Sequence, residues 1–178
     1  MVRFRKLESN IGMDRVRRVR YEKLTVLFFG EGGKEKRFFA MLENSRKFRD
    51  LLPHWAVTPD HAQGESCEVI LNKCIASTAN KSFDVVLCFI DLDKLNHDFG
   101  VKGQAQKLKL EEKAREHNIH IIWQDQDHEQ ELSRAAGRVI GKDRLKQLLK
   151  TKSIEIKIVN SPFVKRIMKT MVDYEHNL

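Results

Sequence analysis

Continuous apolar runs alternate with amphipathic segments along this chain. The two longest runs, at residues 24–29 and 83–90, consist mainly of β-branched, aromatic and other apolar residues. A strand that is apolar on both faces is typical of a parallel sheet covered by helices on both sides. Shorter runs predict further strands at 55–58, 119–123 and 154–159.

Helices are predicted where apolar residues recur every three or four positions. The predicted segments are 34–48, 68–79, 104–117, 128–136 and 142–149, with a last helix that starts at Pro162. Proline is favoured at the first position of a helix because its missing N–H has no partner there anyway. Strands that alternate with helices of 10–15 residues predict an α/β fold with a mostly parallel central sheet flanked by helices.

The same pattern predicts how the chain is organised. Residues 1–22 are polar and basic and are expected to form an arm, 23–137 the central domain, and 138–178 a small, mainly helical C-terminal extension packed on it. With 41% hydrophobic and 33% charged residues, the chain is neither a membrane protein nor a disordered tail. No apolar run approaches the ~18 residues of a membrane span. The N-terminus lacks the apolar stretch of a signal peptide, which predicts a cytoplasmic protein.

Charge indicates the kind of partner. The net charge is +8 among 178 residues, and the excess is concentrated between residues 3 and 20. Such an excess favours nucleic acid through counterion release, although it also suits a solvated, solubilising surface. The candidate contacts in the arm are Arg15, Arg17, Arg18 and Arg20. An odd number of cysteines (Cys67, Cys74 and Cys88) predicts core thiols and no disulfide framework.

Acidic residues follow the two most apolar strands. Glu31 comes after the first, and Asp91 and Asp93 come after the second. Ligands of open α/β sheets bind outside the carboxyl ends of the strands, and residues i and i+2 of a strand share a face. We therefore expect the three carboxylates to converge if the strands are neighbours, and to recruit a hard divalent cation, Mg²⁺ or Mn²⁺. The alternative is that these acids are helix caps or ordinary turn residues.

Glycines around Glu31 indicate a sharp turn from strand to helix. The segment Gly30–Lys34 lacks the spacing of a phosphate-binding nucleotide loop, and Glu31 would direct a negative charge into such a loop. The turn would expose Glu31 and leave amide donors at the helix start for an anion. A zinc-protease motif is excluded as well, because His128-Glu129 has no second histidine at the required spacing.

Two motifs resemble those of stand-alone Toprim proteins, which include the OLD-type nucleases and the RloB-like proteins found beside restriction systems. Residues 30–39 read G-E-G-G-K-E-K-R-F-F, which is similar to the E-G-x-[ST]-E-x-x-[YF]-[FL] opening of that family, and Asp91-Leu-Asp93 is similar to its D-x-D. The resemblance covers about residues 23–135. It implies a Toprim-like, Rossmann-like sheet.

The resemblance also implies roles for individual residues. Glu31 matches a glutamate that acts as metal ligand or general acid–base, and Glu35 matches a second metal-binding glutamate. Asp91 and Asp93 match the metal-binding pair. Lys34 stands where relatives usually carry Ser or Thr, and could offset the acids or hold a phosphate.

A further acidic position follows the fourth strand in such proteins, and here several residues compete for it. Glu129 and Glu131 lie nearest the predicted helix and resemble the F-E-x-W-x-L region of RloB-like proteins, while Asp125 and Asp127 remain alternatives. An acidic helix start stabilised by the helix dipole would give the same pattern. Glu129 is the residue that we assign provisionally to the metal site.

The expected function is Mg²⁺-dependent cleavage of nucleic-acid phosphodiester bonds, in bacterial defence if the resemblance holds. One or two metals on the acids would activate water. Lys34, Lys94 or Lys102 would neutralise charge in the transition state, and the last two would also bind nucleic acid. Two alternatives stay open: a non-catalytic nucleic-acid-binding Toprim module, and a subunit that acts with an ATPase or restriction-system partner.

Overall fold

Four parallel strands form the central sheet of the computed structural model, which describes residues 23–124 and 161–177. The strands are β1 (Leu24–Gly30), β2 (Trp55–His61), β3 (Val85–Asp91) and β4 (Ile119–Gln124). Their order is β2-β1-β3-β4, and every neighbouring pair is parallel. The predicted α/β fold with a Rossmann-like parallel sheet is confirmed.

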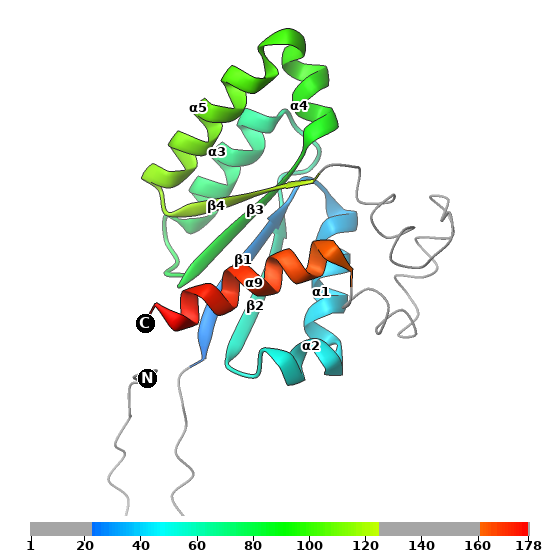
Figure 1. The fold of residues 1–178 in the computed structure, drawn as a ribbon, viewed down its shortest axis with the longest axis vertical. Coiled ribbons are helices and arrows are strands. Elements are labelled where there is room, and N and C mark those ends of the chain that lie inside the picture. Colours follow the sequence, from blue (N-terminus) through cyan, green and yellow to red (C-terminus); the bar gives the residue numbers. More distant parts are fainter. Residues whose placement is uncertain (1–22, 125–160, 178) are drawn as a thin grey trace, which may run out of the picture.

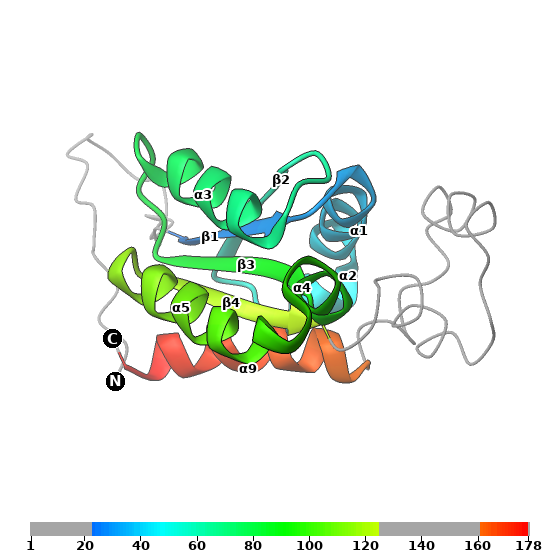
Figure 2. The same cartoon turned by 90° about the horizontal axis from the view of Figure 1, so that it is seen from above.

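Helices cover both faces of the sheet (Figure 1). One face, called the α3 face here, carries α3 (Cys67–Thr78), α4 (Leu92–Phe99), a 3₁₀ turn at Gly100–Lys102, and α5 (Gly103–Glu116). The other, called the α1 face, carries α1 (Gly33–Asn44), α2 (Arg46–Leu51) and α9 (Pro162–His176). In the view from above, the sheet lies between these two layers (Figure 2).

The strands contribute alternate residues to two separate cores, as the pleat of a strand requires. Strand residues buried on the α1 face are Val26, Phe28, Val57, Val85, Leu87 and Phe89. Those buried on the α3 face are Leu27, Phe29, Val86, Cys88 and Ile90. This alternation assigns each residue at a strand end to one face.

Helix α9 runs antiparallel to the strands. Its first turn packs at the carboxyl ends, where the rings of Phe163 and Phe89 lie 5.7 Å apart. Its last turn reaches the amino ends, where Tyr174 and Glu175 contact Trp55. The predicted C-terminal helix is confirmed and completes the core of the α1 face.

Two predicted elements differ in extent. The helix predicted over 34–48 is divided by Ser45, whose hydroxyl accepts a hydrogen bond from the Phe48 N–H and so caps a new helix. The strand predicted to end at residue 58 continues through Pro59 to His61. Within the described residues β2 pairs only with β1 and is an edge strand, where the missing N–H of proline is tolerated.

Several predictions concern residues that lie outside the described ranges. These are the arm at 1–22, the helices at 128–136 and 142–149 and the strand at 154–159.

All three cysteines are free and buried, as predicted. In the part of the chain that the structure describes, no helix combines the length and apolarity needed to cross a membrane.

Candidate functional site at the carboxyl ends of β1 and β3

A topological switch point lies between β1 and β3. The two strands are neighbours, yet the chain leaves β1 for α1 on one face and leaves β3 for α4 on the other. Connections that diverge in this way open a crevice at the carboxyl ends of the strands, where ligands bind in open α/β sheets. Glu31 and Asp91 follow or end these two strands, so the prediction that they meet at one edge is confirmed.

Asp93 does not share a face with Asp91, and the predicted convergence of this pair is wrong. Strand β3 ends at Asp91 and α4 begins at Leu92, so Asp93 lies in the first turn of a helix and is exposed. Residues i and i+2 share a face in a strand but point apart in a helix.

Glu31 forms an ion pair with Lys94 across the crevice. The carboxylate Oε1 lies 2.7 Å from the ammonium Nζ, and the side chains are only 25% and 22% exposed. Burial lowers the pKa of Lys94, but the hydrogen bond and charge of Glu31, followed by the charge of Asp98, outweigh it and leave the pKa raised. Lys94, predicted to contact nucleic acid, is thus held on Glu31, whereas Lys102 is exposed on the 3₁₀ turn.

The Glu31–Lys94 pair lies on the α3 face. Both groups act on the thiol of Cys67, at the start of α3, and Asp98 of α4 accepts a hydrogen bond from the Cys67 N–H at 3.2 Å. Burial, then the charge and hydrogen bond of Asp98, raises the pKa of Cys67 to about 12. The thiol is therefore protonated and unreactive at neutral pH.

Glu35 approaches the crevice from the α1 face. It lies in the first turn of α1, and its Oε2 accepts a hydrogen bond from the Gly32 N–H at 3.0 Å. A Cβ on Gly30 would lie 2.6 Å from the Cβ of Glu35, so glycine is what lets Glu35 pack over β1. Burial raises the pKa of Glu35 against the opposing backbone hydrogen bonds, and the charge of Glu31 raises it further while that of Lys34 lowers it.

Asp91 also lies on the α1 face. It follows Phe89 by two positions in the same strand, and its Oδ1 is buried. Glu31 and Asp91 therefore border the crevice from opposite faces of the sheet. Among residues 23–124 and 161–177, no three acidic, histidine or cysteine side chains form a group that could hold a metal ion. The predicted meeting of three carboxylates in one small volume is not seen.

Two polar residues that the sequence analysis missed stand at the same edge. His61 ends β2 and Gln124 ends β4. His61 was missed because the predicted strand ended at residue 58 and so did not reach it. Gln124 was missed because the acids that follow it are a stronger signal of a metal site. A polar residue at the end of a buried strand was nevertheless the signal that identified Glu31, and it could have identified Gln124 too.

Other predicted residues fall elsewhere. Arg15, Arg17, Arg18, Arg20, Asp125, Asp127, Glu129 and Glu131 lie outside the described residues. Lys34 is half-buried in the first turn of α1, and its charge reaches Glu35.

The chemistry of the donors fits a hard divalent cation, since Glu31, Glu35 and Asp91 offer carboxylate oxygens. Their arrangement supplies these oxygens from two faces, and the ammonium of Lys94 stands at Glu31 where a cation would bind. A metal at this site would have to displace Lys94 from Glu31.

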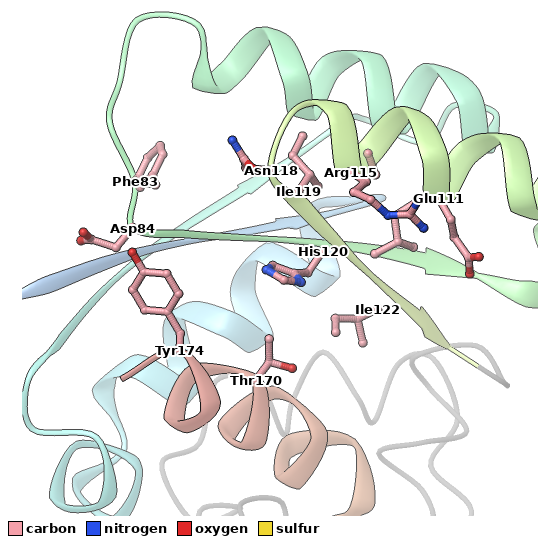
Figure 3. Close-up of a pocket in the computed structure, with 12 residues that line it drawn as sticks. Phe83, Asp84, Glu111, Arg115, Asn118, Ile119, His120, Ile122, Thr170 and Tyr174 are labelled. Carbon is pink, nitrogen blue, oxygen red and sulfur yellow. The ribbon is translucent and has the colours of Figure 1, made fainter. Parts of the chain in front are cut away.

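A cavity of about 820 Å³ lies away from this chemistry, along the outer edge of β4 between α5 and α9 (Figure 3). Its lining includes Arg115, His120, Ile122, Thr170 and Tyr174, and none of the predicted site residues. We place the candidate site at the switch point because Asp91 and the Glu31–Lys94 ion pair are there.

Comparisons with models of protein families, with curated proteins and with solved structures found no match for this chain. The fold and the site together define an α/β protein with a Rossmann-like parallel sheet, whose switch point carries Asp91 and the Glu31–Lys94 ion pair. The Toprim resemblance stays a prediction.

Proposed function

We propose that this chain is a divalent-metal-dependent nuclease whose site is the crevice between the carboxyl ends of β1 and β3. The observation that carries the proposal is the position of Glu31 and Asp91 on neighbouring strands at the switch point. The Toprim-like motifs support the same reaction class, and the net charge of +8 favours a polyanionic substrate.

The residues at the switch point are suited to three different roles: metal binding, charge neutralisation and proton transfer. Glu31, Glu35 and Asp91 do not form a metal-binding group in this arrangement of the described residues, so their side chains would have to rearrange to hold Mg²⁺ or Mn²⁺. The bound ion would polarise the phosphate and activate water. Lys94, displaced from Glu31, would place its charge beside the phosphate oxygens. Glu35 is suited to carry a proton, because its raised pKa favours the protonated carboxyl more than an exposed glutamate does.

The matched substitutions Asp91→Asn and Asp93→Asn test this function. Asp91 borders the crevice while Asp93 is exposed in α4. We expect the parent chain to cleave labelled DNA or RNA oligonucleotides with Mg²⁺ or Mn²⁺. Asp91→Asn should lose about 10²-fold or more of that rate, and Asp93→Asn less than about tenfold. A parent that cleaves neither substrate, or equal losses in both variants, would contradict the proposal.

A non-catalytic nucleic-acid-binding role is the second candidate. It is favoured by the Glu31–Lys94 pair, which neutralises the acid without a metal. This role predicts binding that persists in EDTA and no cleavage with either cation. The cleavage assay together with a binding titration separates the two roles.

A further inference from the structure

Two buried side-chain nitrogens at the carboxyl edge have no hydrogen-bond partner within the described residues. They are Nδ1 of His61 and Nε2 of Gln124, and Gln124 is only 2% exposed. Buried polar atoms are nearly always paired, because an unpaired one loses its hydration without compensation. Two unpaired buried nitrogens at the carboxyl edge of the sheet, where Glu31 and Asp91 also lie, need a physical explanation.

Both residues lie on the α1 face. Gln124 is in register with Asp91, so the two side chains project to the same side of neighbouring strands. Ile122, two positions earlier, packs against the core of that face. His61 follows Val57 of the same core by four positions, and its ring lies against Gly33, where an added Cβ would be 3.6 Å from Nε2.

A row of polar groups therefore crosses the strand ends on the α1 face. From β2 to β4 it contains His61, Glu35 above β1, Asp91 and Gln124. Three strand spacings of about 4.8 Å give it a length of about 14 Å. A row of this length can follow a short stretch of the backbone of one nucleic-acid strand.

We propose that Gln124 binds substrate, its Nε2 donating a hydrogen bond to a phosphate oxygen of a nucleic-acid strand that lies along this row. The inference rests on the proposed function for the class of ligand. Within the described residues this buried donor has no acceptor, which lowers stability, and a bound phosphate would supply one. His61 marks the other end of the same row.

Replacing Gln124 should therefore affect stability and binding in opposite directions. Gln124→Met keeps the length of the side chain and removes both polar atoms, whereas Gln124→Glu replaces the donor with an anion. Gln104→Met, at an exposed glutamine of α5, is the matched control. A residue with only a structural role would lose stability when replaced.

The experiment measures two quantities on the full chain: thermal unfolding without ligand, and binding of a fluorescein-labelled single-stranded DNA 20-mer with Ca²⁺ in place of Mg²⁺. We expect Gln124→Met to unfold at the same or a higher temperature and to bind about tenfold more weakly, the value of one hydrogen bond to a charged group. Gln124→Glu should bind more weakly still, and Gln104→Met should match the parent.

A lower unfolding temperature for Gln124→Met would overturn the inference, because it would show that Gln124 has a partner in the free chain. Unchanged binding, or a parent that binds no oligonucleotide, would overturn it as well. A parent that binds but does not cleave with Mg²⁺, combined with weaker binding by Gln124→Met, would reject the nuclease and keep the substrate-binding residue.

Discussion

Glu31 and Lys94 determine how a cation can enter the crevice, because each neutralises the other at 2.7 Å. A divalent ion must compete with an ammonium group that is mostly buried and whose pKa is raised. The pair thus stabilises the fold without metal, and it would oppose the binding of the proposed metal.

Lys94→Met separates these two effects. Leaving the Glu31 carboxylate without its partner should lower the free energy of unfolding by about 1–2 kcal/mol, between the values for exposed and buried pairs. The same change should raise Mg²⁺ affinity in a calorimetric titration, because the competing cation is gone. Lys102→Met, at an exposed lysine, is the control. Weaker Mg²⁺ binding by Lys94→Met would show that the metal does not bind at Glu31.

The raised pKa of Glu35 predicts that the free energy of unfolding depends on pH. Because its pKa in the folded chain is raised above 4.5, the folded state binds this proton more tightly than the unfolded state. The contribution is fully present below pH 4.5 and is lost as pH rises through the folded pKa. Glu35→Gln should remove this loss, so its stability relative to the parent should increase as the pH rises above 4.5 and through the folded pKa of Glu35.

Urea unfolding of both chains across this range measures the effect. Glu112→Gln, at an exposed glutamate of α5, provides the baseline. A constant difference between Glu35→Gln and the parent would contradict the raised pKa.

At the scale of elements, the contact between β1 and α1 depends on the absence of a side chain at Gly30. An added Cβ would lie 2.6 Å from the Cβ of Glu35, whereas one on Gly33 would meet His61 at an ordinary 3.6 Å. Gly30→Ala should destabilise the chain by about 1–3 kcal/mol, and Gly33→Ala should be neutral or slightly stabilising. Chemical denaturation of the two variants tests this, and equal effects would contradict the close approach of α1.

The sequence predicted the buried strands well and the strand ends poorly. Runs such as residues 24–29 are apolar on both faces, which only a covered parallel strand explains. Helix α4 was not predicted, because Asp91 and Asp93 were expected to share one strand face and the pattern does not show where β3 stops. The extension of β2 through Pro59 depends on its edge position, which the sequence does not show.

For the candidate site, the sequence predicted which edge of the sheet carries the residues but not which face each side chain occupies. Glu31 and Asp91 were placed at one edge because both belong to buried parallel strands. Their separation onto opposite faces depends on single-residue register, since shifting a strand by one position reverses every side chain. The positions of His61 and Gln124 on one face depend on that register too.

At the scale of the whole molecule, the candidate chemistry lies at the carboxyl edge of the sheet, while residues 1–22 carry a net charge of +4, half of the +8 of the chain. Replacing Arg15, Arg17, Arg18 and Arg20 with glutamine should weaken nucleic-acid binding and leave Mg²⁺ affinity unchanged. Each lost phosphate contact should lower the salt slope of binding by about 0.7–0.9. Binding titrations at several salt concentrations measure the slope, and an unchanged slope would assign the arm to solubility alone.

We propose above that a divalent metal binds between the carboxyl ends of β1 and β3. Titration of Mn²⁺ into the isotopically labelled chain, followed by the broadening of amide NMR signals, tests it most directly. Signals of Gly32 and Asp91 should broaden first, well before those of Leu24 and Val85 at the amino ends of the same strands. Broadening that begins at His120 and Tyr174 around the β4 cavity, or that affects all amides alike, would contradict the account.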